Sequence, residues 1–592
     1  MSDAVINFLY SIHQLKFQIG YMIWRFLVYF SVGFISATII DFFITPRPIK
    51  NLNMVYTPFP ILNGLEIILP KAKRWEDSPC IQFQNLAKTY DDVYQIKFGT
   101  KLIIVANSYE SIKQLWCSKN IKANNSRPIN YSFHKVLSKG IYTIGTTPIG
   151  ETYRKSRKHI SERVLSDKRN NDFNYVIMNN ACDEMIDKII NQSINNNNKN
   201  DIDIDIDIKP NLVSNDMVKE AQYFHLKVAL WLTYGFEFNI NDLIHQHLGD
   251  EIIDVENRIT KVRSHVQNPQ DYLPYILRLG FNLCSTKNYE FGELYNKRDR
   301  YLKMFYQYAL NLYDDINSGK MLHKLQSQNN STNAINKIED LKNTLMYNYF
   351  DDAKSKLAIG EITSECLTMV SAGLDNTPLN FKYGLHQMVN YHPEIWDKAF
   401  NDLIQYYKND YQLAYKECAN EMKSEYVKAI VNETLRLFTV LPMSLPREST
   451  DIIAYKDAII PKGTTLFMNC WAANHDPKKF PDPMEFVPDR WLISIVDNDF
   501  TEKMVIDPTM KHFAFGIGCR KCLGNNFAFR ELYILFSKMI LRFKPTPVTE
   551  RKYQTIPSDN SLKLNQYPES LAIEPEPFDL ILERRSFDAD IV

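Results

Sequence analysis

The chain has 592 residues, enough for several domains or for one large enzyme domain. Its 69 Lys and Arg residues balance 69 Asp and Glu residues, so no overall field favours nucleic acid or another polyanion as a partner. Hydrophobic residues at 45% and charged residues at 23% exclude a wholly disordered or fibrous chain. The 9 cysteines are odd in number and widely spaced, which indicates a reducing compartment rather than a disulfide-stapled secreted domain.

The N-terminal region is apolar. Residues 18–44 contain only two charged side chains, Arg25 and Asp41, and approach the roughly 20 residues that a bilayer helix needs. No small-residue cleavage site follows, which argues against a removed signal peptide. We expect residues 1–45 to form a membrane-anchor helix, and the basic residues that follow it place the rest of the chain in the cytosol. A buried amphipathic helix is the alternative.

Residues 46–592 are expected to form one folded domain. Two low-complexity stretches, near 191–208 and 326–336, are predicted to be surface insertions in it. Helical patterns dominate elsewhere, and short strand-like runs occur at 93–98, 102–105 and 464–468. The predicted fold class is therefore mostly α with small β-sheets.

The segment richest in chemical information lies near the C-terminus. It reads Phe515-Gly-Ile-Gly518-Cys-Arg520-Lys-Cys522-Leu-Gly524, and a helical pattern follows it. Glycines allow the backbone to approach a flat ligand closely. Free amide groups at a helix start favour a thiolate over a thiol, and a thiolate suits a soft metal.

This segment resembles the F-x-x-G-x-R-x-C-x-G loop of the cytochrome P450 family, and all five fixed positions match. The resemblance implies a cytochrome P450 fold and makes Cys522 the axial ligand of the iron in haem b, where a thiolate favours O–O cleavage. It implies that Phe515, Gly518 and Gly524 shape the haem-binding loop. It also implies that Arg520 pairs with a haem propionate, since a guanidinium fork suits a carboxylate.

A second match lies upstream. Glu433 and Arg436 are three residues apart, so they share a helix face and can form an ion pair. The later segment Pro488-Asp-Arg490-Trp is similar to the P-E-R-F segment of the family. The resemblance implies that Glu433, Arg436 and Arg490 form a buried network behind the haem, which serves folding rather than catalysis.

A third match is Ala372-Gly373-Leu-Asp375-Asn376-Thr377, which resembles the A-G-x-D-T-T segment of the helix over the haem. Gly373 favours a break beside Ala372 in which dioxygen could lie. Asp375 is expected to help deliver protons. Asn376 stands where the family usually has threonine, and Thr377 is about 100° further around the helix. We expect Asn376 to sustain oxygen activation, with an altered coupling of oxygen use to substrate hydroxylation. The alternative is that the Ala-Gly-x-Asp segment is only a notch for helix packing.

Further positions match contacts with the haem propionates. Arg157 ends the segment Tyr153-Arg-Lys-Ser-Arg157, where the family commonly has W-x-x-x-R, and Arg447 follows Leu-Pro as in many members. A surface arginine is the alternative for Arg447. Basic residues near this side could steer an acidic electron donor or could form a plain solvated face; they are Arg154, Lys155, Lys158 and Lys521.

Segments at 127–146, 369–375 and 468–476 look like the fungal phenylacetate 2-hydroxylase-like branch of the family. This resemblance implies a small aromatic acid as substrate. We expect Arg127 or His134 to bind its carboxylate. The predicted substrate pocket consists of Arg127, Phe133, His134, Thr143, Ala372, Val440, Leu441 and Met443.

The family resemblance thus predicts a haem-thiolate monooxygenase anchored in the endoplasmic reticulum membrane, with its catalytic domain on the cytosolic face. It would use O2 and take electrons from an NADPH-cytochrome P450 reductase, and no nucleic acid would be involved. Hydroxylation of fatty acids, alkanes or sterols is an alternative activity. Two alternatives of other classes are a non-enzymatic haem-binding sensor and a membrane-tethered interaction protein.

Overall fold

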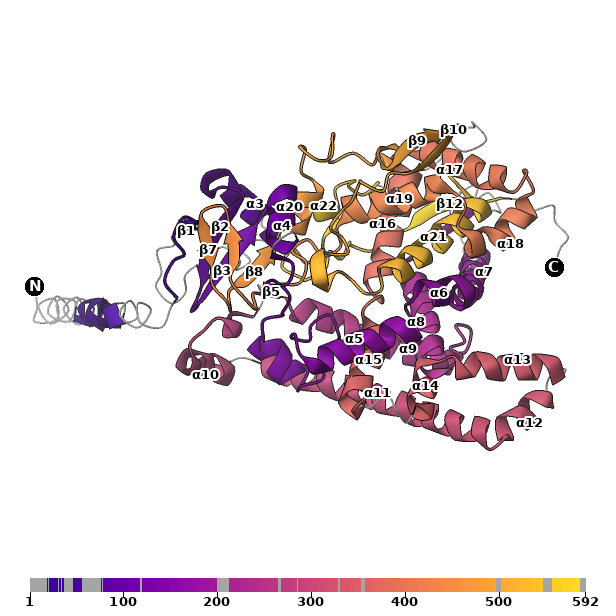
Figure 1. Cartoon of the computed structure of the whole chain (residues 1–592), viewed down its shortest axis with the longest axis horizontal. Coiled ribbons are helices and arrows are strands. Elements are labelled where there is room, and N and C mark those ends of the chain that lie inside the picture. Colours follow the sequence, from indigo (N-terminus) through magenta and orange to yellow (C-terminus); the bar gives the residue numbers. More distant parts are fainter. Residues whose placement is uncertain are drawn as a thin grey trace, which may run out of the picture.

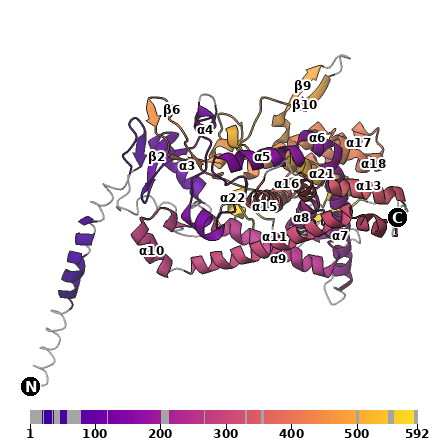
Figure 2. The same cartoon turned by 60° about the horizontal axis from the view of Figure 1, so that its bottom comes forward.

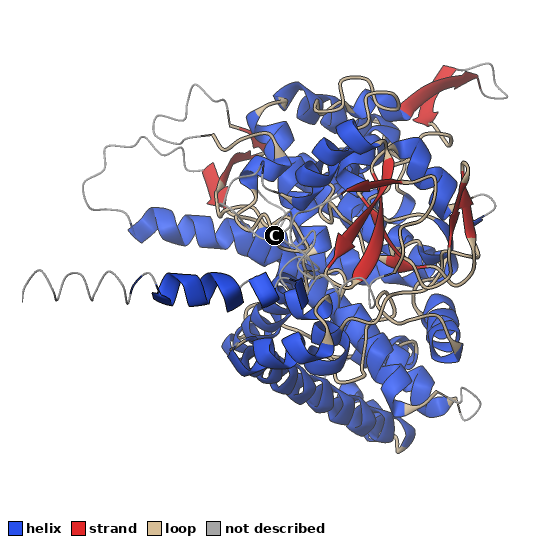
Figure 3. Ribbon diagram, turned by 90° about the vertical axis from the view of Figure 1, so that its left-hand side faces the viewer, coloured by secondary structure: helices blue, strands red, loops and turns tan. Residues whose placement is uncertain are grey.

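The structure is a computed structural model, and it describes most of the chain. The described residues are 19–36 except 20, 30 and 34, then 46–55, 76, 78–117, 120–199, 212–264, 268–284, 286–327, 331–352, 357–496, 502–546 and 556–585. A five-stranded sheet lies at one end of the molecule and a large helical body lies beside it (Figure 1). Strands are a minority throughout (Figure 3), so the prediction of a mostly helical chain with small sheets is confirmed.

The five-stranded sheet contains all three strand-like runs that the sequence pattern predicts. Its order is β1 (Asn53–Val55), β2 (Val93–Phe98), β3 (Lys101–Ala106), β8 (Thr465–Met468) and β5 (Arg447–Glu448). β2 and β3 form an antiparallel hairpin whose turn uses Gly99 at φ 54°, a conformation that glycine adopts without strain. β8 pairs with β3 in parallel and carries β5 on its other edge, which brings residues 447–448 to this sheet.

Three smaller antiparallel sheets account for the other strands among the described residues. They are β11 (Phe543–Pro545), β12 (Leu580–Arg584) and β4 (Leu212–Asn215); β9 (Leu492–Val496) with β10 (Glu502–Ile506); and β6 (Ile453–Tyr455) with β7 (Ala458–Ile460). The first of these ties the C-terminal strand β12 to β4, from the middle of the chain. Strand pairing therefore links segments that are far apart in the sequence.

The helices surround one long, interrupted central helix. It consists of α15 (Ile359–Ser371) and α16 (Asn376–Asn390), and every side chain of α16 from Thr377 to Asn390 is buried. A helix buried on all sides lies in the middle of a core. The helices that pack directly against α16 are α8 (Val218–Tyr234), α17 (Pro393–Tyr406), α19 (Glu425–Phe438) and α21 (Asn525–Arg542).

The other helices cover this core and flank the sheet. In chain order they are α3 (Pro79–Tyr90), α4 (Tyr109–Trp116), α5 (Glu151–Arg163), α6 (Asp167–Arg169), α7 (Tyr175–Lys199), α9 (Leu243–Val262), α10 (Tyr275–Cys284), α11 (Lys287–Asn317), α12 (Lys320–Gln326), α13 (Ser331–Lys342), α14 (Leu345–Asp351), α18 (Tyr411–Glu421), α20 (Cys470–Asn474) and α22 (Ser561–Leu564). A short helical segment, η3 (Tyr131–Leu137), precedes α5.

The predicted membrane anchor at residues 1–45 lies largely outside the described residues. Residues 21–29 are helical and lie apart from the body of the molecule (Figure 2). Their large apolar side chains are exposed. The alternative of a buried amphipathic helix therefore does not hold for these residues. In the part of the chain that the structure describes, no helix is long and apolar enough to cross a bilayer.

The two low-complexity stretches are less separate from the fold than the composition predicts. Residues 191–199 continue helix α7, and residues 200–208 lie outside the described residues. Residues 331–336 begin helix α13, in which Ala334 is 1% exposed and packs with Leu325 and Ile338. Part of the second stretch therefore belongs to a small hydrophobic cluster. Ala334 is buried in that cluster although most of its neighbours in the sequence are polar.

Candidate functional site

Cys522 ends a tight loop that leads into helix α21. The Cys522 amide donates to the Phe515 carbonyl at 2.8 Å, and the Gly516 amide donates to the Phe513 carbonyl at 2.7 Å. Gly518 has φ 74°, in the left-handed region, and a Cβ added there would clash with the backbone carbonyl of Trp116 at the end of α4. Glycine is therefore required at 518 both by backbone conformation and by space.

The Cys522 side chain is exposed although much protein surrounds it. Burial in the surrounding protein is the largest influence on its thiol and raises the pKa. These two facts agree if the sulfur borders a space inside the protein. Three smaller influences lower the pKa of Cys522 and so counteract burial: a hydrogen bond from the Gly524 backbone and the charges of Arg157 and Lys521. The loop thus supplies local stabilisation for a thiolate, the form of cysteine that binds metals.

Three buried guanidinium groups gather beside this loop. Arg127, Arg447 and Arg520 are 8%, 2% and 6% exposed. Burial is the main cause that lowers the pKa of Arg447 to about 9 and that of Arg520 to about 10, and neighbouring arginine charges lower each further. Within the described residues, no carboxylate forms an ion pair with any of the three guanidinium groups. Buried charges normally have a partner, so this cluster fits an anionic ligand.

The aromatic residue on α5 completes this cluster. The Arg520 guanidinium carbon lies 3.8 Å from the centroid of the Tyr153 ring, and the Tyr153 hydroxyl is buried with no hydrogen-bond partner among the described residues. Arg157, on the same helix, donates to the Lys521 carbonyl at 3.2 Å and so joins α5 to the cysteine loop. Uncompensated cations and an unused hydroxyl donor beside a cysteine suit haem, whose two propionates are anionic acceptors.

Arg127 is held in this cluster by backbone carbonyls. Its Nε donates to the Gly145 carbonyl at 2.8 Å, and its Nη1 donates to the Leu445 and Pro446 carbonyls at 2.6 and 2.7 Å. Burial lowers its pKa well below the usual value, and the charges of Arg447 and Arg520 lower it further. The expectation that Arg127 anchors the substrate stays a prediction, because Arg127 is held by these carbonyls and also borders a hollow together with Phe133 and His134.

The central helix is interrupted at the position that the sequence indicates. α15 ends at Ser371 and α16 begins at Asn376, so Ala372 and Gly373 lie between two helical segments. The space beside Gly373 is filled, however, because a Cβ added there would clash with the imidazole of His225 on α8. On that side of the helix Gly373 makes room for a histidine ring, which corrects the expectation that its missing side chain leaves a gap for dioxygen.

The three predicted catalytic residues point to different partners. Asp375 accepts from the Gln222 amide at 3.4 Å, and burial raises its pKa to about 6. The Asn376 amide donates to the Ala372 carbonyl at 2.7 Å, which satisfies an acceptor that the interrupted helix leaves open. Thr377 is buried and donates to Glu531 Oε2 at 3.0 Å. Only Asp375 combines a place in the break with a pKa near neutrality.

The predicted charged network is fully buried at Glu433 and Arg436. The Glu433 carboxylate accepts two bonds from Arg436, both at 2.8 Å, and one from Arg490 at 3.0 Å. It also accepts from the Val487 amide at 2.9 Å and from the Trp491 indole at 2.8 Å, which sequence reasoning did not include. Five donors on one carboxylate satisfy a charge that would otherwise be costly to bury.

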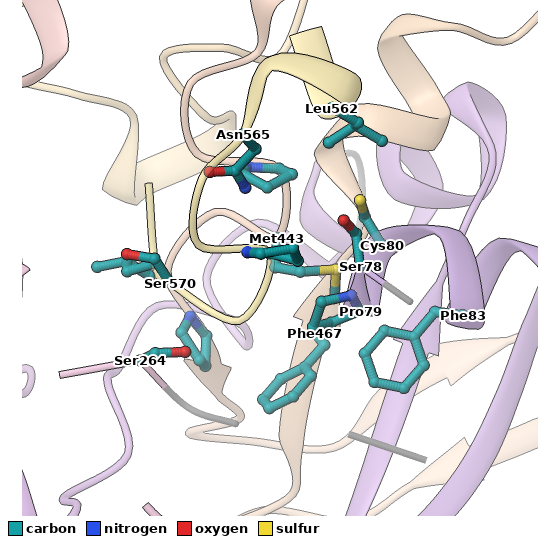
Figure 4. Close-up of a pocket in the computed structure, with 14 residues that line it drawn as sticks. Ser78, Pro79, Cys80, Phe83, Ser264, Met443, Phe467, Leu562, Asn565 and Ser570 are labelled. Atoms are coloured by element: carbon teal, nitrogen blue, oxygen red, sulfur yellow. The ribbon is translucent and has the colours of Figure 1, made fainter. Parts of the chain in front are cut away.

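The predicted substrate residues divide between two hollows that share Pro446 and Leu571. One is lined mainly by apolar side chains, with Met443 among them near Phe83 and Phe467 (Figure 4). The other is lined by Arg127, Phe133 and His134 from the predicted set. The remaining predicted residues, Thr143, Ala372, Val440 and Leu441, border neither hollow.

His134 does not provide a positive charge for a carboxylate. Its Nδ1 accepts from the Asn130 amide at 3.0 Å, and its Nε2 lies 3.2 Å from the Thr146 carbonyl, to which it donates. This bonding fixes a neutral ring, and burial lowers the pKa of His134. Sequence reasoning missed a cation on the opposite wall, Arg263, which follows helix α9 and belongs to no motif.

The comparisons with known proteins agree with this geometry. The sequence matches the family Cytochrome P450 over residues 63–573. It is 32% identical to a phenylacetate 2-hydroxylase of Emericella nidulans, with 84% of each chain covered, and 32% identical to a 3-hydroxyphenylacetate 6-hydroxylase of the same organism, with 84% and 83% covered. It is also 30% identical to a cytochrome P450 monooxygenase of Mycosarcoma maydis, with 76% and 74% covered.

The cysteine loop, the arginine cluster and the interrupted helix define a haem-thiolate protein. The chain belongs to the cytochrome P450 family and is a monooxygenase. The residues that would hold haem are Cys522 at the iron and Arg127, Arg447 and Arg520 at the propionates.

Proposed function

We propose that this monooxygenase hydroxylates a small aromatic acid, with electrons delivered from NADPH by a reductase. The observation that carries the haem site is the cysteine loop beside three buried arginines that lack a carboxylate partner among the described residues. The two Emericella nidulans relatives, whose names state activity on phenylacetate and 3-hydroxyphenylacetate, support the substrate class.

Each part of the site has a distinct role in this proposal. When bound, haem supplies the iron at which dioxygen is activated. With haem bound, Cys522 would bind the iron as a thiolate, and the arginines would neutralise the propionates. Asp375, with a pKa raised to about 6, holds a proton that it can give and take near neutral pH. Asn376 stabilises the interrupted backbone at the Ala372 carbonyl and so keeps Asp375 in place.

We also propose that the reductase docks on the side of the cysteine loop. Arg154 and Lys521 are exposed there, and Arg157 joins their two segments through the Lys521 carbonyl. Lys155 forms an ion pair with Glu151, with 2.8 Å between Nζ and Oε1, which partly neutralises its charge. The basic surface beside the cysteine loop therefore contains fewer free positive charges than the sequence alone indicates. Charge reversal of Lys521 to glutamate should slow electron transfer and weaken its dependence on salt.

A location at the endoplasmic reticulum membrane, with the catalytic domain in the cytosol, remains part of the proposal. Helix α10 supports contact with a lipid surface, because Tyr275, Leu279 and Leu283 are exposed and spaced four residues apart on one face. This helix lies at the same end of the body as strand β1 and the described N-terminal helix (Figures 1 and 2).

The full chain, purified with haem and combined with a reductase and NADPH, tests the substrate class. Phenylacetate, 3-hydroxyphenylacetate, a fatty acid and a sterol are offered in parallel, and products are identified by mass spectrometry. Hydroxylated aromatic acid is the expected product. Oxidation of only the fatty acid or the sterol would replace the aromatic acid by a lipid as substrate, and no product from any compound would favour a haem-binding sensor.

A further inference from the structure

The hollow between η3 and the end of α9 is bordered by Arg263, a cation that forms no ion pair among the described residues. The hollow is bordered by Arg127, Phe133, His134 and Arg263, with Leu571 and Pro446 as apolar wall. Arg127 is fixed by three backbone carbonyls, and His134 is held as a neutral ring. Arg263 therefore remains as the one wall residue among these with a charge available to a ligand.

Among the described residues, no carboxylate forms an ion pair with Arg263, although the charges of Glu256 and Asp375 act on it. Its Nε is buried and makes no hydrogen bond there. The nearby carboxylate of Glu256 is already engaged, since Arg298 binds both of its oxygens and the Tyr301 hydroxyl donates to it at 2.6 Å. Burial lowers the pKa of Arg263 to about 10, which still leaves the side chain charged at neutral pH. A position at the C-terminal end of α9 also favours a cation.

The surroundings of Arg263 suit an aromatic acid. Its guanidinium carbon lies 5.7 Å from the centroid of the Phe133 ring, so a bound anion would have an aromatic wall beside it. The charges of Arg263 and Asp375 act on each other, which places this cation near the interruption of the central helix. A ligand held by its carboxylate at this point would have Phe133 and the apolar side chains of Pro446 and Leu571 as neighbours.

We propose that Arg263 binds the carboxylate of the substrate and thereby selects organic acids over neutral compounds. This inference rests on the proposed function and makes it more specific. A guanidinium forms two parallel hydrogen bonds with a carboxylate, whereas an amide of the same shape offers it only one neutral acceptor. The loss of such a charge-assisted contact should weaken binding of the acid by about 10- to 100-fold.

The test compares acids with their amides in binding experiments on the haem-loaded full chain. The ligand pairs are phenylacetate with phenylacetamide, 3-hydroxyphenylacetate with its amide, and dodecanoate with dodecanamide. Dissociation constants come from the substrate-induced change of the haem spectrum and, independently, from calorimetry. The variants are Arg263→Met, which removes the charge, and Arg263→Lys, which keeps it without the planar fork. Arg258→Met is the matched control, because Arg258 lies on α9 in a surface ion-pair cluster.

The proposal predicts that the unmodified chain and Arg258→Met bind the aromatic acids at least about tenfold more tightly than the amides. Arg263→Met should bind acid and amide equally, and Arg263→Lys should be intermediate. A retained preference for acids in Arg263→Met would overturn the role of Arg263 and leave the proposed function standing. Suppose that only dodecanoate is preferred over its amide and that Arg263→Met loses this preference. This result would support Arg263 as the residue that binds the carboxylate and would overturn the proposal that the substrate is an aromatic acid. Equal binding of acids and amides by the unmodified chain would overturn the role of Arg263, and the proposed function would still be decided by product formation. If Arg263→Met does not take up haem, Arg263→Gln replaces it in the same comparison.

Discussion

Replacement of Asp375 by asparagine changes a carboxyl group that lies in the interruption of the central helix. Burial is the main cause that raises the pKa of Asp375 from 3.8 to about 6, and a hydrogen bond with Thr260 lowers it in part. A carboxyl group with a raised pKa binds its proton more tightly in the folded than in the unfolded state. The folded state therefore loses stability as the pH rises from about 4 to about 6, and the loss is complete above that range.

The size of this effect follows from the shift. A rise from 3.8 to about 6 is roughly two pKa units, and each unit corresponds to about 1.4 kcal/mol, so the ionised Asp375 costs about 3 kcal/mol at neutral pH. Asparagine cannot ionise and does not carry this cost. The variant should gain close to this amount over the unmodified protein near pH 7.5, less the hydrogen bonds that the amide makes poorly, and almost nothing near pH 4.

Turnover of Asp375→Asn should fall, although its stability rises. Asparagine has no acidic proton to deliver, and positioned acids and bases typically contribute about 100-fold or more to a rate. The assay combines urea unfolding followed by circular dichroism at several pH values with product formation at saturating substrate. Asp254→Asn is the control, since Asp254 is exposed on α9 and its pair with Arg258 is long, at 3.8 Å. A stability difference for Asp375→Asn that does not change with pH would refute the reasoning, as would unchanged turnover.

Three further predictions follow from contacts described above. Glu433→Gln should lower the free energy of unfolding by about 3–5 kcal/mol, because it leaves the fully buried Arg436 without a counter-charge, and urea unfolding checks this. Gly518→Ala should reduce haem uptake during expression, since the added Cβ clashes with the Trp116 carbonyl; normal uptake would contradict the need for glycine. Arg447→Met should speed haem loss to apomyoglobin by about tenfold, and an unchanged rate would exclude its contact with a propionate.

The parts of the site that sequence predicted depend on short-range spacing. The residues around Cys522 are consecutive, and Glu433 and Arg436 are one helical turn apart, so motif and helix geometry place them without knowledge of the fold. The interruption near Gly373 is also local. The same holds for strands β2, β3 and β8, which are short runs rich in β-branched, aromatic and aliphatic residues.

The parts that sequence could not place depend on contacts between distant segments. Arg127 is fixed by carbonyls at 145, 445 and 446, and nothing in its neighbours along the chain indicates this. Arg263 faces residues from η3 and from the turn at Leu571, more than a hundred residues away on either side. His225 fills the space beside Gly373 only because α8 packs against the central helix. Such roles follow from tertiary packing rather than from pattern.

The ferrous-carbonyl spectrum of the haem-loaded protein tests the sulfur ligand most directly. The unmodified chain and Cys519→Ser, a substitution of the exposed neighbouring cysteine, should both give the band characteristic of a thiolate ligand. Cys522→Ser should lose that band. A thiolate band that survives in Cys522→Ser, or an imidazole-type band in the unmodified chain, would contradict the assignment of Cys522 as the residue that binds the iron.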